Sequence, residues 1–350
     1  MAVNIAVIGT GYWGKNHVRV LHELHDANLS IIADQNPEVV KNLARQYYTD
    51  FTTDVDSVIN NEFIDGIVLC TPNSTHYEIA KNALLAGKHV LVEKPLCLDI
   101  NEAIELNAIA KEMDRTLMVG HVFSYNPAVN VLKDLVNSYE LGDLSFFMSS
   151  RLGLFAPRSD SGVIYDLAIH DIDIVQYILN RKLPVVVQAS GKSYLQKRFE
   201  EIAFLSLEFD NDFVAQINAS WLTPAKTRNF WISGSQKTAY VDLISQVVEV
   251  FEQNFFKYKS DTNSSNGVMY NLITKEGQSY KPFVDAREPL KAEVSHFIES
   301  MLQKKKPLTD GEVGLSAMLV CEAAIRSLAT KKAYYMEDLM QEFSLVPFVK

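Results

Sequence analysis

Three glycines spaced as GxGxxG follow the first apolar segment of the chain, NIAVI, and open an amphipathic stretch. At this spacing Gly9 allows a tight turn, Gly11 lets the backbone approach a pyrophosphate, and Gly14 lets a helix pack closely on a strand. The free N–H groups at the start of such a helix bind phosphate oxygens. The motif therefore predicts a dinucleotide site to which Tyr12 and Trp13 also belong, and a glycine turn without a ligand is the alternative.

An acidic residue lies 20 positions beyond the last of these glycines, at the end of the second apolar segment. There the carboxylate of Asp34 is placed to accept hydrogen bonds from the ribose hydroxyls of an adenosine. The next residue is Gln35, and no arginine follows that would bind a 2′-phosphate. The pattern favours NAD over NADP, although Asp34 could also serve only as an Asx turn after a strand.

Two polar loops follow further apolar segments, at positions where open α/β sheets bind their ligands. The first loop, TPNSTH, contains Thr71, Asn73 and His76, which could line the cofactor or cap the following helix. The second loop contains Glu93 and Lys94, followed by a proline. A lysine that is partly desolvated beside an oxidised nicotinamide has its pKa lowered towards that of a general base. A solvated lysine that pairs with Glu93 is the alternative.

A third group of reactive side chains lies in the segment SGVIYDLAIHDID. If this segment is helical, Asp166, His170 and Asp173 share one face at positions i, i+4 and i+7. His170 could then exchange a proton with a substrate hydroxyl while Asp166 orients it. A metal site is a competing interpretation, but no further histidine or cysteine lies close by to complete a ligand set. A further alternative is that His170 is an exposed histidine on a capped surface helix.

The first 120 residues, which must position the first three motifs, alternate short apolar runs with amphipathic stretches. Runs such as IVLC and VLV are apolar on both faces, as buried parallel strands are. The alternation predicts a doubly wound parallel α/β sheet of the Rossmann type in a domain of residues 1–122. Strands are expected at residues 4–8, 29–33, 66–70, 89–92 and 116–120, and helices at 14–25, 37–47, 75–86 and 100–113.

From about residue 142 onward, strand-like segments follow one another with tight turns between them. This pattern predicts an α+β domain of residues 123–350 that holds an open antiparallel sheet with helices on one face. The face of the sheet without helices must also bury its apolar side chains. This favours a homo-oligomer, a dimer or a tetramer, formed through this sheet. Strands are expected at 144–151, 185–194, 202–209, 213–221, 228–233 and 239–243, helices at 164–179, 289–303 and 313–330, and an exposed loop at 261–267.

Length and composition limit the classes of function. A chain of 350 residues exceeds the usual size of one hydrophobic core, and a formal net charge of −10 argues against nucleic acid as a partner. Three cysteines without disulfide or metal spacing favour a reducing cytoplasm and are expected to be small buried residues. No stretch approaches the roughly 20 apolar residues of a membrane span. We therefore expect a cytoplasmic protein with no bound metal and no membrane partner.

The order of the motifs GTGYWG, TPNSTH, VEKP and GVIYDLAIHDID resembles the glucose-fructose oxidoreductase, inositol dehydrogenase and MocA family of sugar dehydrogenases. The resemblance covers essentially the whole chain and implies NAD(P)-dependent oxidation or reduction of a ring carbon in a sugar or cyclitol. It implies that Lys94 links the nicotinamide ribose to the substrate hydroxyl, with Asp166 and His170 as the pair from the second domain. Either Lys94 or His170 could be the base; we favour proton transfer to His170, with Lys94 stabilising the alkoxide. The residues that match cofactor contacts of the family are Thr71, Asn73, His76 and Glu93.

Within this family, two stretches resemble the nucleotide-sugar dehydrogenases that act at C3 of UDP-N-acetylglucosamine. The stretch MVGHVFSYNPAV contains His121, expected at the cofactor, and Tyr125 and Asn126, expected to bind the substrate. The stretch SSRLGLFAPRSDSGVIYDLAIHDIDI contains Arg151 and Arg158, cations suited to a diphosphate, although either could be an ordinary surface or interface residue. The resemblance implies hydride transfer from a nucleotide sugar to NAD. The alternatives are an NAD-dependent dehydrogenase of a free sugar or inositol, and a non-catalytic NAD-sensing regulator of the same fold.

Overall fold

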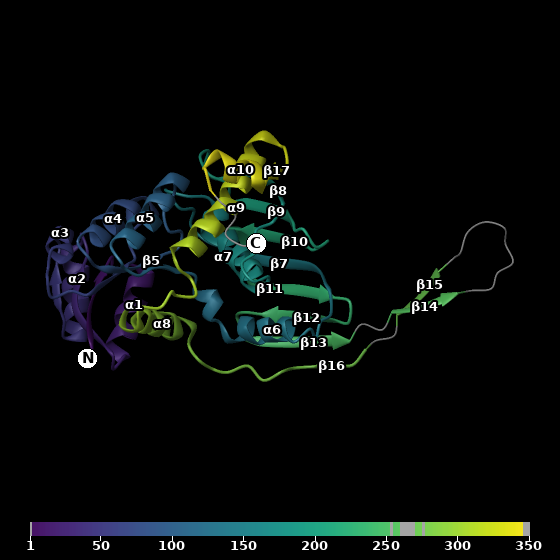
Figure 1. Cartoon of the computed structure of the whole chain (residues 1–350), viewed down its shortest axis with the longest axis horizontal. Helices are drawn as coiled ribbons and strands as arrows, with labels where there is room; N and C mark the ends of the chain where they lie inside the picture. The colour runs from purple at the N-terminus through teal and green to yellow at the C-terminus, as the bar shows by residue number, and fades with distance from the viewer. Residues whose placement is uncertain (1, 253–254, 260–269, 275–276, 346–350) are drawn as a thin grey trace.

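The N-terminal part of the chain forms a six-stranded parallel sheet in the order β3-β2-β1-β4-β5-β6, with helices on both faces (Figure 1). The computed structural model describes residues 2–252, 255–259, 270–274 and 277–345. The predicted doubly wound sheet is confirmed, with the five expected strands and four expected helices in place. Its strands are β1 Val3–Ile8, β2 Ala27–Ala33, β3 Asp50–Thr52, β4 Gly66–Leu69, β5 His89–Glu93 and β6 Leu117–Gly120. Its helices are α1 Tyr12–Glu23, α2 Pro37–Tyr47, α3 Val55–Ile59, the short η1 Asn73–Thr75, α4 His76–Leu85 and α5 Ile100–Glu112.

Two elements of this domain, β3 and α3, are absent from the sequence prediction. β3 is a three-residue edge strand that leaves Phe51 exposed, and α3 has only five residues. Such short elements carry too few apolar positions to show a period of 2 or 3.6. Longer helices carry clearer signals: the Asn36 side chain accepts hydrogen bonds from the first turn of α2, which opens with Pro37.

The second sheet has nine strands in the order β16-β13-β12-β11-β7-β10-β9-β8-β17. It is mostly antiparallel, as predicted, but β7 and β10 pair in parallel. The parallel pair arises because the chain crosses from β7 through a helix to β8, and the strands β8, β9 and β10 then return beside β7. The strands are β7 Leu144–Leu154, β8 Val186–Lys192, β9 Ile202–Glu208, β10 Val214–Ser220, β11 Leu222–Gly234, β12 Lys237–Asp242, β13 Val247–Glu252, β16 Ser279–Tyr280 and β17 Tyr334–Tyr335.

A separate two-stranded sheet, β14 Phe255–Lys259 and β15 Tyr270–Thr274, extends from the β12–β13 end of the large sheet (Figure 1). The predicted exposed loop at 261–267 lies outside the described residues.

Helices cover one face of the nine-stranded sheet. Side chains on that face, such as Ala215, Ile217 and Ala219 of β10, are fully buried. On the opposite face Phe146, Met148 and other large apolar side chains are about two-fifths exposed. The helices of this half are the short η2 Val122–Tyr125, α6 Pro127–Asn137, the π-helical turn η3 Ile164–Ala168, α7 Ile169–Ile178, α8 Pro289–Gln303, α9 Gly311–Thr330 and α10 Met336–Glu342.

Helix α8 packs on the first domain, although the sequence prediction assigned it to the second. It lies beside α1 (Figure 1), where Val294 and Phe297 join the apolar cluster that contains Val18. An ion pair between Arg19 and Glu288 ties the start of α8 to α1. The chain therefore returns to cover the first sheet after it has built the second.

Helix α9 is, by length and composition, apolar enough to cross a membrane, which the sequence analysis did not anticipate. Within the protein, 61% of its apolar window is buried. It packs against α5, α7 and β8, and Gly311 and Gly314 lie against side chains of the first domain. Contact with both domains explains why so few of its positions are polar.

Candidate active site

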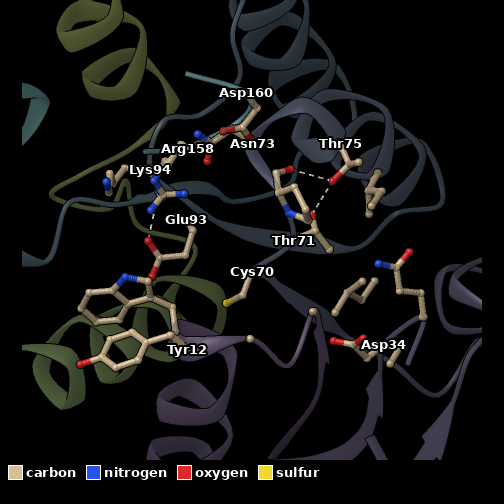
Figure 2. Close-up of a pocket in the computed structure, with 18 of the residues that line it drawn as sticks. Tyr12, Asp34, Cys70, Thr71, Asn73, Thr75, Glu93, Lys94, Arg158 and Asp160 are labelled. Atoms are coloured by element: carbon tan, nitrogen blue, oxygen red, sulfur yellow. Dashed lines mark hydrogen bonds between the residues drawn. The ribbon is translucent and has the colours of Figure 1, made fainter. Parts of the chain in front are cut away.

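A cavity of about 690 Å³ opens at the carboxyl ends of the parallel strands β1, β2, β4 and β5 (Figure 2). One predicted motif follows each of these strands and lines the cavity wall. Residues 157–160 of the second domain complete the wall. Figure 2 shows Asp34 at one end of the cavity and Lys94 and Arg158 at the other. The predicted site residues that line the cavity are Gly9, Gly11, Tyr12, Trp13, Asp34, Thr71, Asn73, Glu93, Lys94 and Arg158.

The glycine turn has the geometry of a phosphate cradle. Gly9 has φ +90°, and a Cβ there would lie 2.6 Å from the backbone carbonyl of Cys70. A Cβ on Gly14 would lie 1.9 Å from the carbonyl oxygen of Gly9, so helix and turn meet at a distance only glycine allows. A Cβ on Gly11 would meet only open space, and no side chain caps the first N–H groups of α1. The turn therefore leaves both room and free donors for a pyrophosphate.

Asp34 lies at the end of β2 and lines the same cavity. Its Oδ2 accepts hydrogen bonds from the backbone N and the hydroxyl of Thr10, at 2.7 and 2.8 Å. Its Oδ1 accepts from the backbone N of Asn36 at 2.9 Å, so the Asx turn is present as well. Burial works to raise the pKa of Asp34, but these hydrogen bonds outweigh it and the pKa is lowered. The side chain is thus an oriented carboxylate.

The loop after β4 connects the two halves of the molecule. The Asn73 side chain donates to the hydroxyl of Ser161 at 3.1 Å, which joins this loop to the second domain. Thr71 accepts a hydrogen bond from the hydroxyl of Thr75 at 2.7 Å. No side chain caps α4, so the alternative capping role of this loop is not used.

His76, predicted to contact the cofactor, is fully buried and does not line the cavity. Its Nδ1 lies 2.8 Å from the carbonyl oxygen of Pro95, and its Nε2 lies 3.0 Å from that of Thr71. The imidazole therefore holds the two cofactor-side loops at a fixed separation. Both ring nitrogens thus face backbone oxygens of these loops, and the predicted contact of His76 with the cofactor stays a prediction.

Lys94 is buried and reaches across to the second domain. Its Nζ donates to the backbone carbonyl of Asp166 at 2.6 Å and lies 3.3 Å from Oδ1 of the same residue. The Lys94–Pro95 peptide bond is cis. Glu93 has another partner, His17, whose Nε2 lies 3.0 Å from Oε1. A solvated lysine paired with Glu93 is therefore not what the structure shows. Burial, reinforced by the charge of Arg158, lowers the pKa of Lys94 against the attraction of Asp166.

Three donors hold the carboxylate of Asp166. Besides Lys94, Arg158 Nε lies 2.6 Å from Oδ1, and the indole N–H of Trp221 donates to Oδ2 at 2.9 Å. Burial works to raise the pKa of Asp166, but the two cations and the indole lower it overall. Trp221 is absent from the predicted site residues, and its position at the end of the strand-like segment 213–221, just beyond the observed β10, was the one available signal.

His170 lies beneath this group, only 8% exposed and in edge contact with the ring of Phe123. It is therefore not the exposed histidine of the alternative interpretation. Burial, together with the charges of Lys94 and Arg151, lowers the pKa of His170 well below its usual value. A neutral imidazole is available at neutral pH to accept a proton.

Asp173 does not join the group of side chains around Asp166. Asp166 belongs to the π-helical turn η3 and His170 to α7. Asp173 pairs with Arg181 at 2.5 Å and accepts a hydrogen bond from Ser124 at 2.7 Å. The carboxylates of Asp166 and Asp173 thus have different cationic partners, which does not fit one shared metal ion.

Gly14, Asp166 and His170 do not themselves line the cavity, and neither do four further predicted residues. His121 is buried, and neither ring nitrogen has a hydrogen-bond partner within the described part of the chain. The hydroxyl of Tyr125 lies 2.9 Å from Nδ1 of His296, and Asn126 caps α6 through its side chain. Arg151 is 2% exposed and pairs with Asp171 at 2.6 Å. Tyr125, Asn126 and Arg151 thus each have a partner within the protein, and their predicted contact with a substrate stays a prediction.

One group among the described residues has donor atoms close enough to hold a metal ion: His17, Cys70 and Glu93, within 4.8 Å of one another. His17 and Glu93 already share a hydrogen bond. Burial, with the nearby carboxylates, raises the pKa of the Cys70 thiol well above its usual value. Without a metal ion the thiol therefore stays protonated, and a metal ion would have to displace this proton in order to bind.

Two family models match the chain. Residues 3–121 match the NAD-binding Rossmann fold of an oxidoreductase family, and residues 154–337 match the C-terminal alpha/beta domain of the same family. The chain belongs to the glucose-fructose oxidoreductase, inositol dehydrogenase and MocA family. The resemblance drawn from the motifs is confirmed, and this oxidoreductase uses NAD as its cofactor.

Several characterised relatives match this oxidoreductase over nearly its full length. A UDP-N-acetylglucosamine 3-dehydrogenase of Acidithiobacillus ferrooxidans is 27% identical over 325 residues, 92% of this chain and 96% of that protein. An inositol 2-dehydrogenase of Rhizobium meliloti is 25% identical over 342 residues, 95% and 98% of the two chains. A solved structure of the Acidithiobacillus enzyme has a TM-score of 0.79 at 25% identity and covers 94% of this chain and 98% of that one. A levoglucosan dehydrogenase in complex with NADH and levoglucosan shares the fold, with a TM-score of 0.80 at 21% identity and coverage of 96% and 100%.

Proposed function

We propose that this oxidoreductase transfers a hydride from C3 of UDP-N-acetylglucosamine to NAD, giving a 3-keto nucleotide sugar. The observation that carries the proposal is the meeting of Lys94, Arg158 and Asp166 at the end of the cavity opposite Asp34. A lysine of lowered pKa and a cation suited to a diphosphate thus converge where a substrate would enter. The similarity to the UDP-N-acetylglucosamine 3-dehydrogenase supports this substrate.

Different residues of the site bind the cofactor and transfer the proton. Free N–H groups after Gly11 would bind the pyrophosphate, and Asp34 would accept hydrogen bonds from the adenosine ribose. NAD, when bound, supplies the ring that accepts the hydride. Neutral His170 takes the proton of the substrate hydroxyl, and the Lys94 ammonium stabilises the oxygen from which that proton leaves. Asp166 keeps the ammonium in place, so that the C–O bond becomes a carbonyl as proton and hydride depart.

The proposal is tested by following NADH formation with UDP-N-acetylglucosamine, free N-acetylglucosamine, glucose and myo-inositol. We expect turnover with the UDP-sugar alone, and loss of that turnover in Lys94→Ala. Turnover of a free polyol would contradict the nucleotide-sugar substrate while leaving the dehydrogenase chemistry intact. NAD binding without turnover of any of the four would favour an NAD-sensing regulator.

A second candidate is an NAD-dependent dehydrogenase of a free sugar or inositol. It is favoured by the match to inositol 2-dehydrogenase over 95% of this chain. Such an enzyme has no diphosphate to bind, so Arg158→Gln would leave its KM for the free sugar unchanged, even where loss of the Asp166 contact lowers kcat. A UDP-sugar dehydrogenase would lose affinity for its substrate.

We also propose that the chain acts in the cytoplasm as a homo-oligomer, a dimer or a tetramer, formed through the outer face of the nine-stranded sheet. This face presents Phe146, Met148, Phe204 and Val214, each at least two-fifths exposed. Apolar side chains gathered on one sheet face are typical of a subunit interface. Light scattering is expected to show an oligomer that Phe146→Glu dissociates; a monomeric wild-type chain would contradict this arrangement.

A further inference from the structure

Two arginines lie directly opposite each other on neighbouring strands of the second sheet. Arg228 of β11 is paired in register with Arg151 of β7, so both side chains project from the same face. This is the helix-covered face, since Phe230 and Ile232 further along β11 are buried on it. Arg151 is fully buried, whereas Arg228 is only partly buried, at the rim of the covered face.

The carboxylates near these arginines already have partners. Asp171 pairs with Arg151 at 2.6 Å, and Asp166 pairs with Arg158 at 2.6 Å and with Lys94 at 3.3 Å. Arg228 itself has no hydrogen bond or ion pair from its side chain to any residue that the structure describes. Directly opposed like charges destabilise a sheet, and an arginine does not relieve the repulsion by losing its proton. The fold thus holds an uncompensated positive charge in a chain whose net charge is −10.

The position of Arg228 places this charge beside the catalytic group. Asp166 and Tyr12 both lie close enough to act on the charge of Arg228, and Arg228 in turn acts on His170. Tyr12 belongs to the turn at the start of α1. Arg228 therefore lies near the glycine turn and the Asp166 group, on the same strand face as Arg151. Burial, followed by the charge of Arg151, lowers the pKa of Arg228, as expected for a cation that lacks an anionic partner.

We propose that Arg228 binds a phosphate oxygen of the substrate diphosphate, a role predicted from the sequence for Arg151 and Arg158. The inference rests on the proposed nucleotide-sugar substrate and adds to it a residue that determines specificity. The guanidinium group of Arg151 is bound by Asp171 and that of Arg158 is bound by Asp166 through Nε, whereas Arg228 has its donors available for a charge-assisted, bidentate contact with phosphate beside that of Arg158. A substrate phosphate would neutralise the opposed arginines.

The test is calorimetric titration of UDP into the full-length protein saturated with NAD. In Arg228→Gln we expect the dissociation constant for UDP to rise at least tenfold, because a charge-assisted hydrogen bond is lost. Arg228→Lys should recover part of the affinity, since a point charge replaces a fork of donors. Lys226→Gln removes the same charge from an exposed position on the same strand and should leave UDP affinity unchanged. An unaltered NAD affinity and a melting temperature no lower than that of the wild type would show that the variants are folded.

Two further outcomes separate this inference from the proposed function. If Arg228→Gln binds UDP and oxidises UDP-N-acetylglucosamine with the wild-type KM, the role of Arg228 is refuted and the proposed function stands. If UDP binds through Arg228 but UDP-N-acetylglucosamine is not oxidised, the proposed function fails and the diphosphate contact stands. A wild-type protein that does not bind UDP overturns the contact, whichever sugar is oxidised.

Discussion

Lys94 and Asp166 come from different domains and meet where the lysine ammonium donates to the aspartate backbone carbonyl at 2.6 Å. The carboxylate of the same aspartate lies 3.3 Å from the ammonium. Burial alone would favour the neutral amine, and Asp166 opposes that tendency. The protonation of the lysine therefore depends on the second domain being in place.

Asp166→Asn is predicted to move the basic limb of the kcat/KM profile to lower pH. Loss of the carboxylate removes an interaction that raises the pKa of Lys94, so the ammonium loses its proton earlier as pH rises. A neighbouring charge of this kind shifts a pKa by about one unit or more. The profile should be measured beside Asp160→Asn, which alters another acid of the cavity wall. A shift of the acidic limb instead would identify Lys94, not His170, as the base.

His170→Gln is predicted to lower kcat by roughly 10²–10⁴-fold, the usual contribution of a general base, with little change in NAD affinity. Because the pKa of His170 lies well below the usual value, the wild-type acidic limb should fall below pH 6.5. That limb should disappear in the variant. His25→Gln, at an exposed position, is the matched control. An unchanged kcat would remove His170 from the chemistry.

Asp34→Ser is predicted to raise the KM for NAD about tenfold and to improve the relative use of NADP. The carboxylate is oriented towards the cavity by Thr10 and Asn36, and it would repel a 2′-phosphate. Steady-state kinetics with both cofactors provide the measurement, and Asp50→Ser at the exposed edge strand is the control. If the ratio of the two specificity constants does not change, Asp34 serves only as an Asx turn.

The sequence predicts the first domain well because its signals are local. The strand of NIAVI, the glycine turn and the cap at Asn36 each depend on residues within a few positions of one another. The cavity wall follows from this, since the carboxyl ends of parallel strands converge on one edge of a sheet. Gly9, Asp34 and Lys94 could therefore be placed together from the sequence alone.

Partners brought together by the second domain could not be predicted in this way. The opposition of Arg151 and Arg228 depends on the register of β7 against β11, and the contact of Trp221 with Asp166 depends on the parallel pairing of β10. No local pattern encodes either register. For the same reason the sequence does not show that Arg151 is already bound by a carboxylate. Its partner Asp171 lies on a helix whose orientation the sequence does not determine.

Arg151→Met is predicted to destabilise the protein by about 3–5 kcal/mol, because it leaves the buried carboxylate of Asp171 without its cation. Urea unfolding measures the loss. The double variant Arg151→Met, Asp171→Leu should regain much of the stability, since it removes the stranded charge as well. Equal losses in the single and double variants would mean that packing around the aliphatic part of Arg151, and not its charge, is what matters.

Glu293→Gln is predicted to stabilise the protein at neutral pH and to have little effect at about pH 4. Glu293 lies on α8 with no exposed surface, and neither carboxyl oxygen has a hydrogen-bond partner within the described residues. Burial, followed by the charges of Glu93 and Asp173, raises the pKa of this carboxyl well above its usual value. The folded state thus keeps a proton that the unfolded chain releases. The stability that this proton confers is complete below the unfolded pKa and is lost as pH rises.

The amide that replaces the carboxyl group in this variant cannot ionise, so its advantage over the native Glu293 should grow steadily from acidic to neutral pH. Urea unfolding of both proteins across that range gives the difference directly, and Glu299→Gln on an exposed turn of the same helix is the control. A variant that is less stable at neutral pH would mean that the carboxylate is charged in the folded state. The carboxylate of Glu293 would then need a proton or a cation from the buried side chains around Glu93.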